Sequence, residues 1–224
     1  MPIVAAGTLA LHTPPALSWP TWASLATAAG TLVLAMATFA SVRSSNRSAR
    51  IAEQALQEQR RPVLVASRLD DPLQKINFID GHWVHVGGAG AVAEHQEGNT
   101  YLAVSIRNMG AGIGVLQGWS VSAGLNASRE HAGEQQFRTQ SRDLYIPAGD
   151  VGLWQAALRD PADDAYEPIA TAATQREPIS VELLYSDQVG EQRTISRFTI
   201  TPAGEDAWVA TAGRHWFLDR AGPR

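Results

Sequence analysis

The first 42 residues contain no Asp, Glu, Lys or Arg, and Arg43, Arg47 and Arg50 then follow in quick succession. A charged side chain at the centre of a bilayer costs about 2.5–3.5 kcal/mol on insertion scales, so an uncharged run of this length is a candidate membrane span. We therefore divide the chain into four parts. These are an uncharged segment 1–21, a transmembrane helix 22–42, a basic juxtamembrane helix 43–61 and a β-sandwich domain 62–224.

The predicted transmembrane helix runs from Trp22 to Val42. Its 21 residues, at about 1.5 Å each, cover about 30 Å, the thickness of the hydrocarbon core. Trp19 and Trp22 stand at one end, where indole rings favour the headgroup boundary, and Arg43 begins the arginine cluster at the other. Since arginine-rich flanks stay cytoplasmic, we expect a single-pass protein of the inner (plasma) membrane, with the N-terminus outside and the C-terminal domain in the cytoplasm.

Two other interpretations of this segment remain open. A cleaved signal peptide would use Ala35-Met36-Ala37 as its small-residue cleavage site, but the chain lacks a positively charged start and its apolar stretch begins late. An Ala-rich helix buried in a soluble core is the second alternative. A membrane anchor with the lipid bilayer as its partner fits the charge pattern best.

Helical character is predicted to continue beyond the membrane. Residues 44–59 contain neither Gly nor Pro, and Pro62 ends the helix. Small residues recur every seven positions and form a seam through which two helices can approach closely, so self-association is a hypothesis. The members of this seam are Ala23, Gly30, Ala37 and Ser44, followed by Ile51.

The rest of the chain is acidic. Five Arg and two Glu give residues 1–61 a net charge of +3, whereas residues 62–224 have a net charge of −7. A basic collar is attracted to anionic lipid, and an acidic domain is a poor binder of nucleic acid because phosphate neutralisation dominates that affinity. No nucleic-acid partner is therefore expected. The chain has no cysteine, which excludes disulfides, thiolate metal sites and cysteine nucleophiles.

From Pro62 onward, short alternating or β-branched runs are separated by turn residues, a pattern typical of strands. Asn108–Gly112 is predicted to form the tight turn of a hairpin. The long polar stretches 87–99 and 124–135 are predicted to be mobile loops. The pattern as a whole predicts a mainly β domain, an antiparallel immunoglobulin-like β-sandwich. The predicted strands are 63–69, 82–86, 101–107, 113–123, 137–146, 152–158, 179–185 and 193–201, with short segments at 208–211 and 216–218.

One short helix is predicted between the strands. Asp160 suits the N-cap, Pro161 suits the first turn, and Ala165–Thr174 form the body. Pro168 falls inside this body, where it splits or shifts the helix.

Three segments carry a resemblance to a group of known proteins: Arg107–Ile113 (RNMGAGI), Leu183–Asp187 (LLYSD) with Gln192–Thr194 (QRT), and Arg214–Arg220 (RHWFLDR). The chain resembles uncharacterised single-span membrane proteins of high-GC Gram-positive bacteria. The resemblance runs from the anchor to the C-terminus and implies the same layout of anchor, basic collar and β-domain. It implies no activity.

No residue pattern predicts a catalytic, cofactor or metal site. His82 and His85 are three apart on a predicted strand and therefore point to opposite faces. The acidic group Asp160–Glu167 lacks the spacing of a calcium loop and fits helix capping better. Ser120–Gly124 fails the Gly-x-Ser-x-Gly pattern at its first position.

The domain holds five tryptophans, which more often fill cores or interfaces than form sugar-binding platforms. Arg214, His215 and Trp216 combine the residue types favoured at interfaces and are our candidate contact surface. We expect a membrane-anchored, non-enzymatic protein-interaction or structural module. The alternatives are a membrane-tethered enzyme with a dispersed active site and an exported sandwich that binds glycans or another ligand.

Overall fold

A computed structural model describes residues 19–219. Residues 1–18 of the predicted N-terminal segment, and Arg220 of the third resemblance segment, lie outside this range. The chain divides into two compact units, residues 1–54 and residues 55–224. The first described element is one continuous helix, α1 (Trp19–Gln59), which contains the predicted span 22–42 and all but the last two residues of the predicted extension 43–61.

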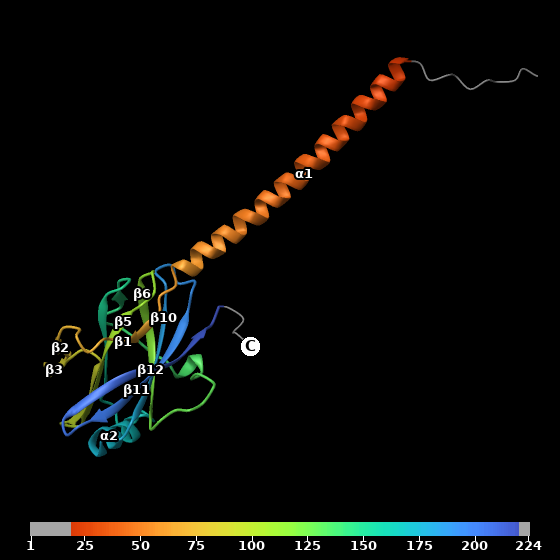
Figure 1. The fold of residues 1–224 in the computed structure, drawn as a ribbon. Coiled ribbons are helices and arrows are strands. Elements are labelled where there is room, and N and C mark those ends of the chain that lie inside the picture. The colour runs from red at the N-terminus through yellow and green to blue at the C-terminus, as the bar shows by residue number, and fades with distance from the viewer. Residues whose placement is uncertain (1–18, 220–224) are drawn as a thin grey trace, which may run out of the picture. The chain divides into compact units, whose positions relative to one another are not determined.

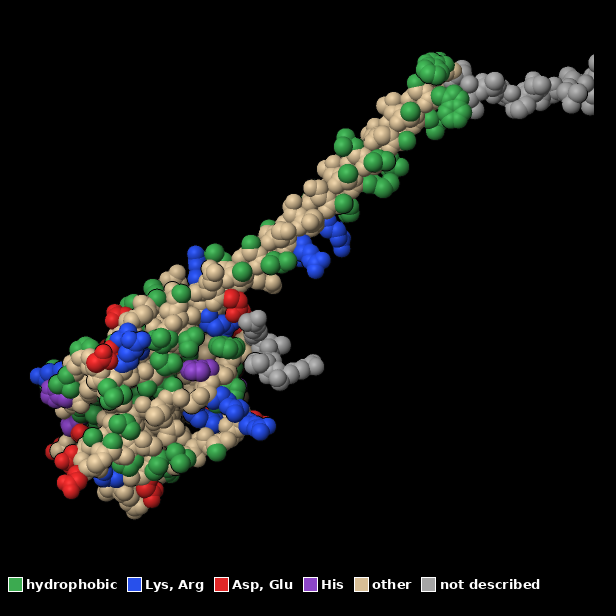
Figure 2. All heavy atoms as spheres, viewed as in Figure 1, with side chains coloured by type: hydrophobic (Ala, Val, Ile, Leu, Met, Phe, Trp, Pro, Cys, Tyr) green, Lys and Arg blue, Asp and Glu red, His purple; other side chains and the backbone are tan. Residues whose placement is uncertain are grey.

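Helix α1 is long and apolar enough to cross a membrane, by its length and composition. Its large apolar side chains are exposed throughout, including Leu34 at 69% and Phe39 at 68%. Figure 1 shows α1 as one unbroken helix, and Figure 2 shows hydrophobic side chains along its surface. An all-round apolar helix is normally covered by lipid or by a protein core, and no residue of this apolar window is buried in the described structure. A signal sequence near the N-terminus meets the same criteria of length and composition.

The second unit is mainly antiparallel β-structure. Its largest sheet runs in the order β1-β5-β4-β12-β11-β10-β6-β7, with β9 on the free side of β5 and β8 on β6. Strands β4 and β12 are joined by only two residue pairs, Ala91 with Trp208 and Gly90 with Val209. The strands of the unit are β1 (Leu64–Ala66), β2 (Gln74–Asn77), β3 (Trp83–Val86), β4 (Gly90–Gln96), β5 (Asn99–Asn108), β6 (Gly114–Ala123), β7 (Arg138–Thr139), β8 (Tyr145–Ile146), β9 (Val151–Leu158), β10 (Ile179–Ser186), β11 (Thr194–Ala203) and β12 (Ala207–Phe217).

The two halves of this sheet pack against one another. Side chains of β5 and β9, such as Val104 and Trp154, share one core cluster with Leu183 of β10 and Phe198 of β11, and each of these four is 0% exposed. This arrangement is consistent with a β-sandwich-like fold, as predicted.

Helix α2 (Tyr166–Gln175) adds Ile169, Ala172 and Ala173 to the same core. It begins later than predicted, and its N-cap is Ala165 rather than Asp160. The Asp160 carboxylate instead accepts the N–H of Ala162 in the preceding turn. Pro168 lies in the first turn of α2, where a missing N–H costs little, so it does not split the helix.

A second, smaller core lies under the β2–β3 hairpin. Ile76, Phe78 and Val84 of this region pack on Val92 of β4 and Tyr101 of β5. The opposite face of the hairpin leaves Trp83 52% exposed beside Lys75, whose ammonium lies 4.4 Å from the ring centre. Three of the five domain tryptophans are buried, namely Trp119, Trp154 and Trp208.

Several local predictions were wrong. Asn108–Gly112 does not close a hairpin, because β5 pairs with β1, β4 and β9 while β6 pairs with β10, β7 and β8. The predicted loop 87–99 contains strand β4. The predicted strand 137–146 is two short strands, β7 and β8, which both pair with β6, and the two final segments form one strand, β12.

Candidate functional site

The chain enters the β-domain through residues 60–64, here called the connector. This segment lies directly on the turn between β5 and β6. A Cβ added to Gly112 would stand 1.7 Å from the carbonyl oxygen of Arg60, and one added to Gly110 would stand 2.1 Å from that of Arg61. Neither glycine has a positive φ, so both are needed for close backbone approach rather than for a tight turn.

The side chain of Asn108 holds the connector and this turn together. Its carbonyl oxygen accepts the N–H of Val63 at 3.2 Å and that of Gly110 at 3.0 Å. Its amide donates to the carbonyl oxygens of Gly112, at 2.7 Å, and Ile146, at 3.0 Å. The residue is 0% exposed. Two of these bonds satisfy backbone groups of the adjoining turn, and the bonds with Val63 and Ile146 satisfy backbone groups that are distant in sequence.

A chain of buried hydrogen bonds continues from the end of the connector. The N–H of Leu64 donates to Tyr185 Oη at 3.1 Å, Tyr185 Oη lies 2.8 Å from Ser196 Oγ, and Ser196 Oγ lies 2.6 Å from His215 Nδ1. Leu64, Tyr185 and Ser196 are 0% exposed. Burial raises the pKa of the Tyr185 hydroxyl and lowers the pKa of the His215 imidazole, because the charged form is disfavoured in each case.

Arg61 completes this region. Its guanidinium lies 4.5 Å from the ring centre of Phe217, and its side chain is 10% exposed. Its Nη2 atom pairs with Glu58 Oε1 at 3.5 Å, whereas Nε and Nη1 have no hydrogen-bond partner among the described residues. Contact with the ring therefore adds to a single, long ion pair for this cation. Two residues after Phe217, the carboxylate of Asp219 pairs with the guanidinium of Arg193, with Oδ1 3.0 Å from Nη2.

The three resemblance segments therefore meet at one place. The first supplies Asn108, Gly110 and Gly112, the second supplies Tyr185, and the third supplies His215 and Phe217. These six residues surround residues 60–64, and we call them the connector socket. Reasoning from the residues alone did not predict it, because the three segments are far apart in sequence. Their common feature was the resemblance, which gave no role to any of them.

The predicted contact residues lie at the edge of this socket. Arg214 is exposed, whereas His215 and Trp216 are partly buried. The Trp216 indole N–H donates to the carbonyl oxygen of Arg129 at 3.0 Å, and the Arg197 guanidinium lies 4.8 Å from the indole ring centre. Arg214 Nη1 also donates to the carbonyl oxygen of Arg129, at 3.4 Å. All three residues thus have partners inside the domain, and their role as a contact surface stays a prediction.

The predicted membrane-interface residues all lie on α1 and are exposed there. They are Trp19, Trp22, Arg43, Arg47 and Arg50. The predicted small-residue seam of Ala23, Gly30, Ala37 and Ser44 is likewise on α1, and a Cβ added to Gly30 would meet no atom within 4 Å.

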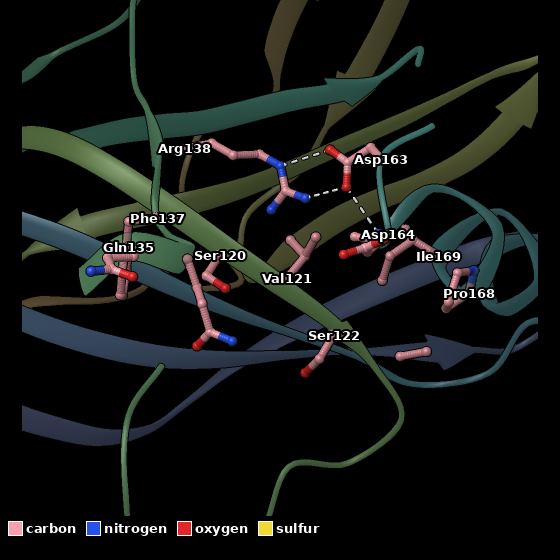
Figure 3. A pocket seen from close by; sticks show the side chains of 13 residues that line it. Ser120, Val121, Ser122, Gln135, Phe137, Arg138, Asp163, Asp164, Pro168 and Ile169 are labelled. Atoms are coloured by element: carbon pink, nitrogen blue, oxygen red, sulfur yellow. Dashed lines mark hydrogen bonds and ion pairs between the residues drawn. The ribbon is translucent and has the colours of Figure 1, made fainter. Parts of the chain in front are cut away.

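A shallow hollow of about 580 Å³ lies among β6, the turn before β7 and the start of α2. Figure 3 shows Arg138 and Asp163 directed at one another at its side. The Arg138 guanidinium donates to both carboxylate oxygens and lowers the pKa of Asp163. The hydroxyl-bearing residues Ser120 and Ser122 face this hollow without an adjacent histidine among its described lining residues. The hollow therefore offers a polar surface rather than an activated nucleophile.

One serine does touch a histidine. Ser196 Oγ is within hydrogen-bonding distance of His215 Nδ1, as a serine nucleophile and its base would be. Ser196 is 0% exposed, however, and its oxygen also binds Tyr185, so no substrate reaches it in this structure. Among residues 19–219, no group of three His, Asp or Glu side chains is placed to hold a metal ion.

Comparison of the chain with protein-family models, with curated proteins and with solved structures finds no match.

Proposed function

We propose that this protein is a single-pass membrane protein that displays a non-enzymatic β-domain, acting as an interaction or structural module, on the cytoplasmic side of the inner (plasma) membrane. The observation that carries the proposal is the uncovered apolar length of α1, with Leu32, Val33 and Leu34 each more than half exposed. Such a surface is stable only when lipid or another protein covers it. The arginines from Arg43 onward support the cytoplasmic placement.

The connector socket supports a structural role for the attachment itself. Asn108, Gly110 and Gly112 fix the backbone of residues 60–64 against the β5–β6 turn. The connector backbone is thus part of the folded domain, which suits a structural module that begins at this segment. We also propose an immunoglobulin-like assignment for the sandwich, supported by the antiparallel pairing of every strand.

A C-terminal fusion to a phosphatase that folds only outside the cytoplasm tests the orientation. We expect no phosphatase activity from the full chain, and we expect a signal when the phosphatase is replaced by a fluorescent reporter that folds only in the cytoplasm. Activity from the C-terminal fusion would overturn the cytoplasmic placement. A shortened chain beginning after Ala37 would instead identify a cleaved signal peptide.

Photocrosslinking tests the proposed contact surface at Arg214. A photoreactive amino acid at position 214 is expected to give a discrete adduct in membranes, and the same amino acid at exposed Glu205 serves as the matched control. Equal labelling from both positions, or none from either, would contradict this contact surface. For the seam, Gly30→Leu and Ala37→Leu are expected to reduce crosslinked dimers in membranes, and unchanged dimers would rule out self-association through it.

A further inference from the structure

The hydrogen-bond chain that ends at His215 has only one direction of donation. A backbone N–H is always a donor, so Tyr185 Oη accepts from Leu64 and must give its own proton to Ser196 Oγ. Ser196 Oγ must then give its proton to His215 Nδ1. Neither hydroxyl has another hydrogen-bond partner among the described residues. The folded chain therefore requires an unprotonated Nδ1 and a neutral imidazole with its proton on Nε2.

Protonation of His215 breaks this order. A second ring proton on Nδ1 turns the acceptor at the end of the chain into a donor facing Ser196 Oγ. Either Ser196 then loses the acceptor for its hydroxyl proton, or the direction of donation reverses so that Ser196 donates to Tyr185. In the second case the Tyr185 hydroxyl loses its acceptor. In both arrangements one buried hydroxyl is left without a partner, next to the bond that holds Leu64.

The charged groups on the elements around His215 do not favour the imidazolium. Arg61 of the connector lies over Phe217, and Arg197 of β11 and Arg214 of β12 lie over Trp216, so the two aromatic residues that follow His215 are in contact with three arginines. The carboxylates of Glu182 on β10 and Asp219 after β12 are paired with Arg197 and Arg193. The loop before β7 adds Arg129, Glu130 and His131, whose ring lies edge-on to Trp216.

We propose that His215 is a proton sensor, and that its protonation loosens the hold of the β-domain on the connector at Leu64. The sensor lies at the connector socket, so acidification acts on the point where the domain is attached to α1. This pH response follows from the order of donors and acceptors in the hydrogen bonds between Leu64, Tyr185, Ser196 and His215. It does not depend on whether α1 lies in lipid. Burial lowers the pKa of His215, so stability is expected to fall as the pH drops below about 6.5, where the unfolded chain takes up the proton first.

Hydrogen exchange of single amides in the detergent-solubilised full chain tests the proposal. The measured quantity is the exchange rate of the Leu64 amide divided by that of the Val104 amide in the core, which cancels the intrinsic effect of pH. Between about pH 7.5 and about pH 5 we expect this ratio to rise about tenfold in the wild type. In His215→Gln, whose side-chain oxygen accepts but does not titrate, the ratio is expected to stay constant.

Two further variants separate a sensor from a merely structural contact. Ser196→Ala removes the acceptor of the Tyr185 hydroxyl and separates it from His215, so the Leu64 exchange ratio is expected to be raised at both pH values and to lose its dependence on pH. His85→Gln, at an exposed histidine of β3, should keep the full dependence. A wild-type ratio that does not change with pH would overturn the proposal, and so would an unaltered pH dependence in His215→Gln or Ser196→Ala.

Discussion

Arg197 and Glu182 form a buried ion pair, in which each side chain is 5% exposed and Arg197 Nε lies 2.8 Å from Glu182 Oε1. The same guanidinium donates to three carbonyl oxygens of the loop between β6 and β7, and Glu182 accepts the N–H of Ala132 from that loop. Register pairs Glu182 directly with Arg197 across β10 and β11. The loop 124–133 is therefore held on the outer face of this sheet largely by this ion pair, with further hydrogen bonds from Ser180 and Trp216.

Replacement of Arg197 by lysine is expected to lower the free energy of unfolding by about 3 kcal/mol. Lysine keeps the charge but lacks the planar fork that reaches one carboxylate and three carbonyl oxygens. Urea unfolding followed by tryptophan fluorescence measures the change, and trypsin cleavage at Arg129 reports release of the loop. Arg214→Lys is the matched control and should change stability by less than about 0.5 kcal/mol. Equal effects of the two variants would contradict the role of Arg197.

Asn108→Ala is expected to destabilise the domain by about 2–4 kcal/mol, because Val63, Gly110, Gly112 and Ile146 each lose a hydrogen-bond partner. The connector should also become sensitive to trypsin at Arg60, whereas the following Arg61-Pro62 bond resists this protease. Digestion followed by mass spectrometry detects the cut. Asn77→Ala, at an exposed position of β2, provides the control and should leave Arg60 protected. Protection of Arg60 in Asn108→Ala would show that this side chain does not hold the connector.

Gly112→Ala is expected to cost about 2–3 kcal/mol, since its methyl group would overlap the carbonyl oxygen of Arg60. Gly133→Ala serves as the comparison, because its φ is −61° and the nearest atom to its added Cβ is 3.7 Å away. That variant should be neutral or slightly stabilising. Thermal unfolding of both proteins gives the answer. A tolerated Gly112→Ala would mean that the connector does not pack on the β5–β6 turn as described.

The sequence predicted the strands that bury regular apolar runs and missed those that do not. Strands β10 and β11 are rich in β-branched and other apolar residues and lie close to their predicted positions. Strand β2 (QKIN) and the end of β4, with Glu94, His95 and Gln96 exposed, are stabilised by cross-strand pairing, which their local composition does not reveal. The hairpin predicted at Asn108–Gly112 was wrong for a similar reason. Its glycines allow the close approach of the backbone of residues 60 and 61, which the local sequence does not reveal.

Less of the candidate site was predictable than of the fold. The residues Tyr185, Ser196 and His215 come from three different strands, and only the register of β10, β11 and β12 brings them together. Burial of Arg197 with Glu182 also depends on that register. Arg214, His215 and Trp216 were singled out for their residue types, but their contacts within the domain required the coordinates of the 124–133 loop.

Asp80 gives the domain a dependence on acid. Burial raises the pKa of its carboxyl, but hydrogen bonds from Tyr101, Arg159 and the His82 N–H outweigh this and lower the pKa to about 2. An acid whose pKa falls on folding stabilises the fold above its unfolded pKa, so this contribution is lost as the pH drops from about 4 towards about 2.

Asp80→Asn should therefore lose stability at neutral pH by about 1 kcal/mol and show a flatter loss below about pH 4. Melting temperatures across this range check it, with exposed Asp206→Asn as the control. An unchanged acid profile in Asp80→Asn would refute the assignment.

The membrane anchor is tested most directly by alkaline carbonate extraction of cells that produce the full chain, with the mass of the recovered protein measured by mass spectrometry. The account predicts an intact chain, with Trp22–Val42 retained, that sediments with the membranes after the carbonate wash. Recovery of the chain in the supernatant, whether intact or cleaved after Ala37, would contradict it.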